Sequence, residues 1–560
     1  MKRRGRWIIA GVVLLAAAGL VIYLIKSGET AKELAEIASQ GGERELREPF
    51  REPSESPRIL IFALDGIGKN EFDQAILSGN TPRITGLLGS PLGEGLFEHG
   101  YSAPNTVAIL PSTTMAAWSS IFTGEPAART GVPGNEWFAR DEMRFYAPAP
   151  VSVTDNHHTL KMITDGLLGD AIKTPTLYDV ADVRSYVSLS GVYRGADLYT
   201  TPKPSSIAEL FAGVAKGLAG DKSVSQEAYS EVDSESVEKL IEAIEKHGLA
   251  NLQVVYFPGI DLYTHVASDP LNQQQRYLQE VLDPAIGQVL DAYERRDALS
   301  DTYVIFIADH GHTPVLDDDR HSLATEGDDE PPALIEKAGF RVREFSIEPD
   351  DDEQDYQAAV AYQGAIAYVY LADRSTCPQE DDRCDWRRGP RLEEDVMPVV
   401  RAFYAANETG EGVPALKGTL DLIFAREPRH VDEEAAPFMV FDGNQLVPIN
   451  DYLKQHPRPD LIRLEERIRG LGAGPYGHRA GDVLLLARSG LEHPVEERYY
   501  FSGIYRSWHG SPTAQDSFVP FVLARKADSG QRLRDVMTRV MGNEPSQLNM
   551  VPLVRALINK

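Results

Sequence analysis

A threonine hydroxyl is the first reactive group that the sequence offers. Pro111 precedes a small polar cluster at residues 112–114, and an apolar run then continues to Gly124. Hydroxyl residues at such a point are typical of a helix N-terminus, where the helix dipole favours an alkoxide and an incoming phosphate. The same pattern is more often a plain cap on a buried helix. Other parts of the chain must therefore decide whether Thr114 is a nucleophile.

Acidic residues and histidines follow three apolar, strand-like runs. They are Asp65 after residues 58–64, Asp261 and His265 after residues 252–257, and Asp309 and His310 after residues 303–308. Continuous apolar runs predict strands buried on both faces of a parallel sheet, and ligands bind at the carboxyl ends of such strands. The spacing of Asp261 and His265 puts both on one face of a helical turn, where they can share a metal ion.

One more histidine, His509, lies in a His-Gly turn shortly before a final strand. The chain thus offers seven oxygen and nitrogen donors: Asp65, Thr114, Asp261, His265, Asp309, His310 and His509. Mixed aspartate and histidine ligation favours zinc over manganese or iron. Two divalent ions close together can clamp the attacking and leaving oxygens of an in-line phosphoryl transfer.

The composition limits the partners. The formal net charge of −28 argues against a nucleic-acid polymer, although an acidic surface can surround a site that binds one phosphate through metal ions. A chain of 560 residues has room for a large α/β domain with an insertion or a second domain.

The first 28 residues have the features of a membrane anchor. Four basic residues precede an uncharged run from Trp7 to Ile25 that is long enough to span a bilayer. With the basic flank inside, the bulk of the chain lies outside the cytoplasm, facing the bacterial periplasm or the cell surface. The alternative is a cleaved signal, because Ala16–Ala18 offers small residues, and the protein would then be secreted.

Cys377 and Cys384 are the only two cysteines of the chain. An exported compartment permits a disulfide, which would close a short local loop. Two free thiols, or two ligands of a small metal site, are the alternatives. In each case the pair is more typical of a structural feature than of a catalytic one.

The order of apolar runs and helical segments predicts an α/β fold with a mostly parallel sheet sandwiched by helices. We expect a polar stalk at residues 29–57 and a catalytic core at residues 58–320 and 481–560, ending in a C-terminal helix. Residues 321–480, which contain acidic runs, are expected to form an inserted, smaller α+β subdomain. We expect substrate specificity to lie in that insertion.

Taken together, these motifs resemble the alkaline phosphatase superfamily, and within it the type I phosphodiesterase or nucleotide pyrophosphatase branch. The resemblance rests on ALDG at 63–66, PSTTMAAWSSIFTG at 111–124, GVPGNEWFAR at 131–140, DLYTH at 261–265, ADHGHTP at 308–314 and WHG at 508–510. The six motifs occur in the order of the family. Each is weak alone, but all six in register are specific.

The resemblance implies a phospho-threonine intermediate on Thr114, which water later hydrolyses. It implies that Asp65, Thr114, Asp309 and His310 hold one zinc ion and that Asp261, His265 and His509 hold the other. Asn135 matches an asparagine that donates to a phosphate oxygen, with a plain turn residue as the alternative.

Two departures from the family bear on the substrate. Related phosphomonoesterases carry a Lys-x-Arg pair where this chain has Val192 and Arg194. Arg194 is then expected to contact the substrate phosphate, unless it forms a surface salt bridge, and the loss of the lysine favours a singly charged diester. Ala116-Ala117 stands where several eukaryotic members have Pro-Asn, which puts a transfer of nucleotide specificity in doubt.

We therefore expect a two-zinc hydrolase of small phosphoric esters that slightly favours diesters. The alternatives are a phosphomonoesterase of the alkaline phosphatase type, a transferase of a phospho-group to an envelope lipid or glycan, and a non-catalytic exported binding protein. The complete donor set argues against the binding protein. The single membrane span argues against the lipid transferase.

Overall fold

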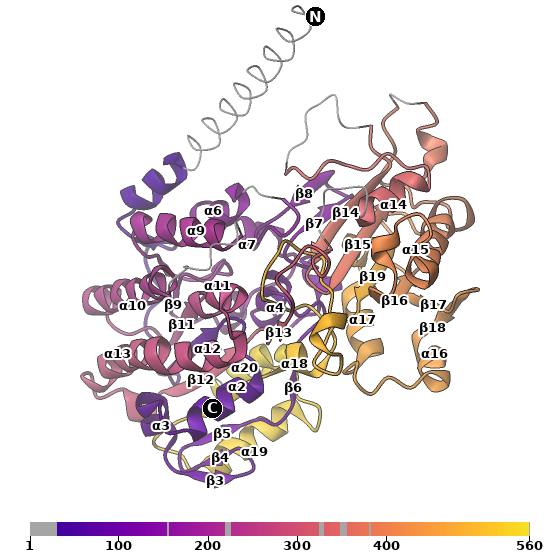
Figure 1. Ribbon diagram of the computed structural model, residues 1–560. Coiled ribbons are helices and arrows are strands. Elements are labelled where there is room, and N and C mark those ends of the chain that lie inside the picture. Colours follow the sequence, from indigo (N-terminus) through magenta and orange to yellow (C-terminus); the bar gives the residue numbers. More distant parts are fainter. Residues whose placement is uncertain are drawn as a thin grey trace, which may run out of the picture.

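The computed structural model describes residues 31–153, 156–218, 226–323, 330–347, 355–379 and 382–558. A ten-stranded sheet, called sheet 1 here, lies at the centre of the fold (Figure 1). Its strands, in spatial order, are β1 (Glu43–Glu45), β10 (Leu198–Thr200), β9 (Ser185–Ser188), β11 (Leu252–Phe257), β2 (Ile59–Leu64), β12 (Tyr303–Ala308), β22 (Phe521–Ala524), β5 (Gly100–Ser102), β4 (Leu96–Phe97) and β3 (Pro91–Gly93).

The centre of sheet 1 is parallel and its two sides are antiparallel. Strands β10, β9, β11, β2 and β12 run in one direction, whereas β1 and the four strands from β22 to β3 pair antiparallel. The predicted mostly parallel sheet is thus corrected to a mixed sheet. The apolar runs located β2, β11 and β12 because these strands are fully buried, but most of the antiparallel strands are too short to produce such a run.

Helices cover both faces of sheet 1, because successive side chains of a strand point to opposite faces. Ile61 of β2 packs into one core and its neighbour Phe62 into the other. The first face is covered by α4 (Thr114–Ile121), α7 (Leu167–Ala171), α8 (Leu177–Ala181), α19 (Gly530–Met541) and α20 (Met550–Ile558). The second face is covered by α2 (Lys69–Leu77), α3 (Pro82–Leu88), α10 (Glu227–His247), α11 (Gly259–Val266), α12 (Pro270–Tyr277) and α13 (Asp283–Glu294).

A second, six-stranded antiparallel sheet, sheet 2, lies beside the first (Figure 1). Its order is β14 (Ala358–Gln363), β15 (Ile366–Leu371), β19 (Val483–Ala487), β16 (Leu420–Ala425), β17 (Met439–Phe441) and β18 (Leu446–Pro448). One face packs against α14 (Pro331–Lys337) and α15 (Met397–Thr409), and the other against α17 (Leu464–Gly472) and the hairpin β7 (Trp137–Ala139) and β8 (Arg144–Tyr146).

Strand β19 is a correction to the expected layout. We expected the core to resume at residue 481, but β19 pairs with β15 and β16 inside sheet 2. All five of its residues are buried, and an apolar run of this kind fits a central strand of either sheet. The sequence pattern therefore does not say which sheet receives it.

Residues 31–57 pack on the fold and do not form the expected stalk. Residues 31–39 are helical, and Ile37 contacts Leu160 and Ile207. Arg51 donates to Asp197 at 2.9 Å, and β1 adds an edge strand to sheet 1. Because this segment is polar in composition, the sequence did not indicate the few apolar and ionic contacts that hold it on the fold.

The Trp7–Ile25 stretch, expected to be a membrane anchor, lies outside the described residues. Within the described part of the chain, no helix has the length and apolar character to cross a membrane. Cys377 and Cys384 are joined in a disulfide, which decides between the alternatives that the sequence left open.

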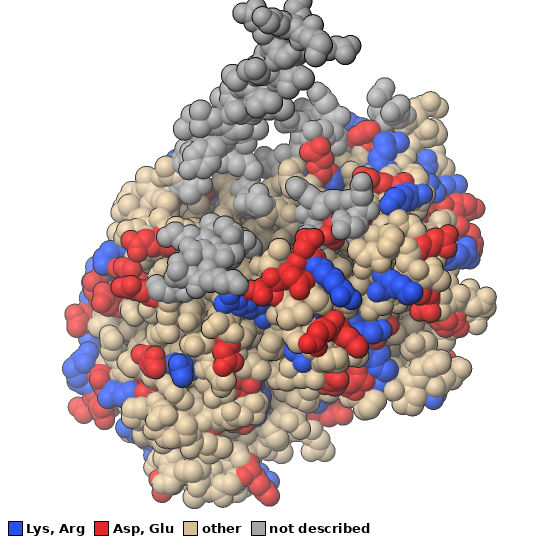
Figure 2. Space-filling model, in the orientation of Figure 1, with Lys and Arg blue, Asp and Glu red and all other residues tan. Residues whose placement is uncertain are grey.

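Charge on the surface is mixed in sign. Figure 2 shows acidic and basic side chains interspersed over the face that it draws. Acidic residues outnumber basic ones by 84 to 56 in the chain.

A buried ion pair ties the end of the β7–β8 hairpin to sheet 2. Arg140 donates to Asp482, and the two side chains are only 2% and 5% exposed. Asp482 also accepts from the backbone N–H of Leu371 at 2.9 Å.

Removing Arg140 would leave the Asp482 carboxylate buried without its counter-charge. Arg140→Met should therefore lower the free energy of unfolding by about 3–5 kcal/mol in urea titrations. Arg144→Met is the control on the same hairpin, because that guanidinium is exposed and only covers the Tyr146 ring at 4.6 Å; its loss should cost about 0.5–1 kcal/mol. Equal losses for both variants would show that the buried ion pair does not hold the hairpin on sheet 2.

Candidate metal centre and active site

Thr114 is the first residue of α4, as the Pro111 pattern predicted. The preceding Thr113 has an extended backbone and its side chain makes no capping hydrogen bond. Thr114 Oγ1 lies 3.3 Å from Nε2 of His310, and the residue is only 7% exposed. The hydroxyl of Thr114 therefore faces the predicted metal donors and does not serve as a cap.

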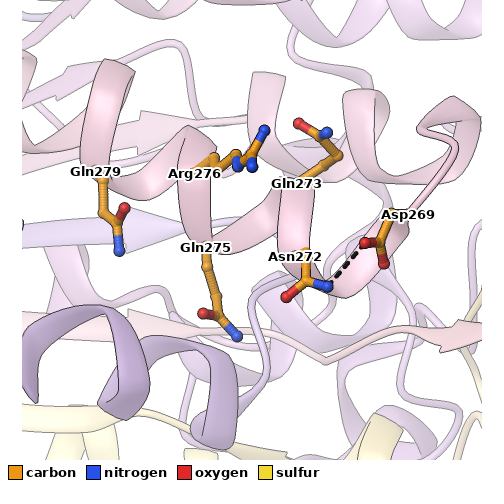
Figure 3. Close-up of a pocket in the computed structure, with 6 residues that line it drawn as sticks. All are labelled: Asp269, Asn272, Gln273, Gln275, Arg276 and Gln279. Atoms are coloured by element: carbon orange, nitrogen blue, oxygen red, sulfur yellow. Dashed lines mark hydrogen bonds between the residues drawn. The ribbon is translucent and has the colours of Figure 1, made fainter. Parts of the chain in front are cut away.

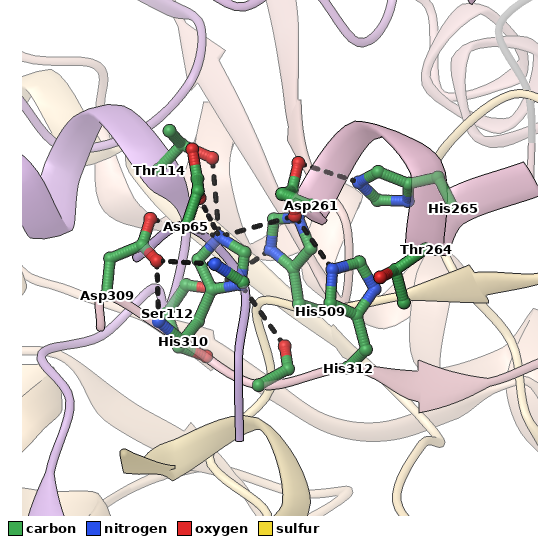
Figure 4. Close-up of polar contacts among 12 residues, drawn as sticks. Asp65, Ser112, Thr114, Asp261, Thr264, His265, Asp309, His310, His312 and His509 are labelled. Atoms are coloured by element: carbon green, nitrogen blue, oxygen red, sulfur yellow. Dashed lines mark hydrogen bonds and ion pairs between the residues drawn. The ribbon is translucent and has the colours of Figure 1, made fainter. Parts of the chain in front are cut away.

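The parallel centre of sheet 1 gathers the donors at one edge, where β2, β11 and β12 all end (Figure 4). Asp65 follows β2, and Asp309 and His310 follow β12. One ligand atom from each of these three residues lies within 4.8 Å of the others. The N–H of Gly66 donates to Asp309 Oδ1 at 2.8 Å and so joins the two strand ends.

A second donor group adjoins the first. Asp261, His310, His312 and His509 each offer one ligand atom within 4.8 Å of the others. His265, one turn after Asp261 on α11, has its Nε2 3.5 Å from Asp261 Oδ2. His310 belongs to both groups, so the predicted donors form one continuous centre.

Hydrogen bonds at Nδ1 fix the tautomers of the histidines. Nδ1 of His265, His310 and His509 lies 2.7, 3.1 and 3.0 Å from the carbonyl oxygens of Ser507, Gly311 and Ser112. A carbonyl oxygen only accepts, so each Nδ1 carries the hydrogen and each Nε2 presents a lone pair to the centre. Metal-binding histidines are commonly oriented in this way.

His312 is a further imidazole that the sequence reasoning missed. Its Nε2 lies 2.7 Å from Asp261 Oδ1 and its Nδ1 lies 3.0 Å from Ser507 Oγ. The Ser507 hydroxyl donates to the carbonyl of Thr264 at 2.9 Å, so it accepts from Nδ1 of His312. Nε2 of His312 thus faces Asp261 inside the centre. The second histidine of the ADHGHTP motif was the signal available for it.

The carboxylates of this centre are buried without enough partners. Asp65 Oδ1 and Asp309 Oδ2 have no hydrogen-bond partner in the part of the chain that the structure describes. Burial, with Asp309 and Asp261 nearby, raises the pKa of Asp65 well above its usual range, and burial also raises the pKa of Asp309. Burial opposes ionisation of Asp261 too, but His265 and His312 outweigh it and hold the pKa of Asp261 well below its usual range.

Two of the histidines resist protonation. Burial and the neighbouring His310 lower the pKa of His509 well below its usual range, and burial lowers the pKa of His312 to about 4. Buried carboxylate oxygens and neutral imidazole lone pairs that face one another require a shared cation. This donor set fits divalent metal ions such as zinc.

Asn135 is held beside Thr114 by contacts from α4 and from sheet 2. Its Oδ1 accepts from the N–H of Met115 at 2.9 Å, which leaves the amide NH₂ for another acceptor. Its own N–H donates to Gln363 Oε1, at the end of β14, at 2.7 Å. A Cβ at Gly134 would lie 1.9 Å from that Gln363 oxygen, so a larger residue there would displace the Gln363 carboxamide. Asn135 is thus oriented by sheet 2.

Arg194 is not among the residues that line the cavity at Thr114, so the structure places it away from the predicted phosphate contact. Its guanidinium donates to the carbonyl oxygens of Gly169 and Ile172 at 2.6 and 2.7 Å and also to that of Thr174. These contacts secure the segment around α7. These hydrogen bonds occupy the guanidinium of Arg194. The hollow that Arg194 lines does not have Thr114 among its lining residues.

Two polar side chains that the sequence did not single out hold the strand ends. Tyr256, near the end of β11, donates to Asp65 Oδ2. Gln547 Nε2 donates to the carbonyl oxygens of Ala308 and Asp309 at 2.8 and 2.6 Å. Tyr256 lies in a predicted strand, but Gln547 comes from the far end of the chain, where no local pattern marks it.

The sequence matches the family model described as type I phosphodiesterase / nucleotide pyrophosphatase over residues 59–392. The fold and the donor set define a hydrolase that acts on phosphoric ester bonds. Because the match covers more than half of the chain, the chain belongs to this family, which is part of the alkaline phosphatase superfamily. No curated protein matches the sequence.

Solved structures that resemble the chain include murine ectonucleotide pyrophosphatase/phosphodiesterase 5. It aligns over 90% of this chain and 95% of its own, with 13% sequence identity and a TM-score of 0.46. An inactive variant of the murine protein in complex with AMP gives the same values. The human protein aligns over the same shares with 13% identity and a TM-score of 0.48.

Metal binding should stabilise the protein more as the pH rises. A raised carboxyl pKa in the folded state means that stability is greatest below the usual value of 3.8 and is lost as the pH rises through the raised pKa values of Asp65 and Asp309. A bound cation offsets that loss, and protons compete with it less at higher pH. The increase in Tm on adding Zn²⁺ to chelator-treated protein should therefore grow between about pH 5 and 7.5.

Differential scanning fluorimetry with and without Zn²⁺ measures this increase. Asp65→Asn is the matched variant, because it removes one of the buried charges while keeping the shape of the side chain. After treatment with chelator, Asp65→Asn should lose less stability with rising pH than the unaltered protein does under the same conditions. A Zn²⁺-induced Tm change that is the same at every pH would contradict the assignment.

Proposed function

We propose that this protein hydrolyses phosphodiesters at a centre of two divalent metal ions, most consistent with zinc, through a phospho-threonine intermediate on Thr114. Asp65, Thr114, Asp309 and His310 would hold one ion, and Asp261, His265 and His509 the other, with His312 beside Asp261. Bound ions would neutralise phosphate oxygens and lower the pKa of the threonine hydroxyl. The observation that carries the proposal is the 3.3 Å approach of Thr114 Oγ1 to His310, the residue shared by both donor groups.

Residues of the chain account for the remaining steps. Thr114 Oγ1 attacks phosphorus in line, so that an oxygen–phosphorus bond forms while the bond to the leaving alcohol breaks. The positive end of the α4 dipole favours the negative charge that develops beside it. The NH₂ group of Asn135 would donate to a phosphate oxygen. Water then cleaves the phospho-threonine ester, releasing a phosphomonoester and restoring the hydroxyl of Thr114.

The charge around Thr114 supports a diester over a monoester. Among the described residues that line the cavity beside Thr114, none is a lysine or an arginine. Arg194, the one cation that we expected there, is bonded to backbone carbonyls elsewhere. A dianionic monoester needs more positive charge than a monoanionic diester.

We also propose that the folded domain lies outside the cytoplasm. The Cys377–Cys384 disulfide supports this location, because disulfides persist in oxidising compartments. Anchoring through Trp7–Ile25 rests on the sequence pattern of that segment.

Removing the Thr114 hydroxyl should abolish turnover. Thr114→Ala should lower kcat for bis(p-nitrophenyl) phosphate by at least about a thousandfold, because the nucleophile is lost, and Thr114→Ser should retain part of the activity. Thr113→Ala is the matched control, since the buried Thr113 hydroxyl has no hydrogen-bond partner within the described residues. It should remain active.

Enzyme that is acid-quenched during turnover of bis(p-nitrophenyl) phosphate should carry a p-nitrophenyl phosphoryl group on Thr114, which peptide mass spectrometry detects. Equal activity of Thr114→Ala and unaltered enzyme would overturn the assignment of the nucleophile. A higher kcat/KM for p-nitrophenyl phosphate than for the diester would overturn only the diester preference.

A further inference from the structure

A large cavity opens beside Thr114. Its volume is about 610 Å³, which is in the range of sites for organic ligands. Thr114, Asn135 and the metal donors Asp65 and Asp261 form one part of its lining. A substrate phosphate at Thr114 would therefore have a neighbouring space for one of its ester groups.

The rest of the lining is dominated by aliphatic side chains. They come from α6 (His157–Thr164), α9 (Pro204–Leu218), α10, α11 and the loop after β9, and include Met162, Ile163, Leu189, Leu210, Val232 and Leu262. These elements are far apart in the sequence, yet each contributes an apolar side chain. The cavity is thus an apolar chamber that shares its wall with the phosphate site.

Polar side chains are a minority on this wall, although Thr159 Oγ1 and Trp508 Nε1 have no hydrogen-bond partner among the described residues. Ser152 Oγ already donates to Glu136 Oε1. No lysine or arginine is found among the described lining residues, so a second phosphate would meet no positive side chain. The donors and acceptors of a base would lose their water against the aliphatic part of the wall, which is unfavourable unless hydrogen bonds replace it.

Another hollow of the molecule has the opposite character. The groove along α12 in Figure 3 is lined by Asp269, Asn272, Gln273, Gln275, Arg276 and Gln279. It shares no lining residue with the cavity at Thr114. The polar groove is therefore separate from the space that adjoins the phosphate site.

We infer that the physiological substrate is a phosphodiester with a flexible aliphatic chain, and that this chain occupies the apolar cavity. The inference rests on the proposed hydrolysis at Thr114 and narrows its substrate class. Aliphatic chains gain free energy for each methylene that leaves water for such a surface. A nucleoside ester lacks this contribution.

A series of p-nitrophenyl alkyl phosphodiesters, from methyl to hexyl, tests the inference on the intact enzyme. The leaving group is constant, so only the alkyl chain changes. We expect kcat/KM to rise about threefold to fourfold for each methylene that enters the cavity and the hexyl ester to surpass thymidine 5′-(p-nitrophenyl phosphate). A flat series, or a preference for the thymidine ester, would overturn the inference.

The same series separates this inference from the proposed function. Hydrolysis of the methyl ester without a gain from longer chains leaves the hydrolase standing and rejects the aliphatic substrate. If neither the methyl ester nor bis(p-nitrophenyl) phosphate is hydrolysed, the proposed function itself fails.

Variants of α9 test whether the alkyl chain of the substrate occupies this cavity. Leu210→Trp, on the cavity side, should flatten the rise beyond the shortest esters, whereas Ala212→Trp, at an exposed position of the same helix, should leave it unchanged. If a folded Leu210→Trp enzyme shows the same rise of kcat/KM with alkyl length, the alkyl chain does not occupy this cavity and the inference is overturned. The series on the unaltered enzyme remains decisive if the variant does not fold.

Dihexanoyl phosphatidylglycerol, used below its micelle concentration, distinguishes two sources of the aliphatic chain. Hydrolysis of it at an efficiency near that of the hexyl ester would assign glycerophospholipids. Hydrolysis of the single-chain ester alone would assign phosphodiesters of single-chain alcohols. Both results support the aliphatic class.

Discussion

Buried negative charge without a matching positive side chain is the constraint on which this structure depends. Asp65, Asp261 and Asp309 meet at one edge of sheet 1, and the imidazoles beside them turn lone pairs inward. Burial, together with the neighbouring carboxylates, raises the pKa values of Asp65 and Asp309, so that protons relieve part of this cost. Divalent cations relieve it more completely, so that metal binding and the stability of this edge are coupled.

The parallel centre of sheet 1 explains how residues so distant in the chain reach this edge. β2, β11 and β12 are neighbours in register and end together, so the residue or turn after each strand meets the others. The arrangement is then fixed by polar side chains from elsewhere. Gln547 secures the backbone at the end of β12, and Gln363 of sheet 2 orients Asn135.

The sequence predicted the donors at the strand ends, but it did not predict the polar side chains from elsewhere that fix them. The donors after β2, β11 and β12 were predictable, because each directly follows a continuous apolar run and because six motifs occurred in family order. His312 was missed although it stands two residues after His310. Gln363 and Gln547 were beyond sequence reasoning, since a lone glutamine has no periodic signal. The site of Arg194 and the sheet of β19 depended on tertiary packing, which a local pattern does not contain.

The part of the chain that lines the cavity at Thr114 also differs from the part that we expected to govern the substrate. We expected residues 321–480 to govern the substrate, but none of the described residues in that range lines the cavity at Thr114. The wall comes instead from α6, α9, α10 and α11 and from the loops beside them. Sheet 2 reaches the site through Gln363, which orients Asn135 and is not among the residues that line the cavity. Reaction and recognition share α11, which carries Asp261 and His265 as well as Leu262. The helices α6, α9 and α10 carry none of the proposed metal donors, so they can change without disturbing the strand ends.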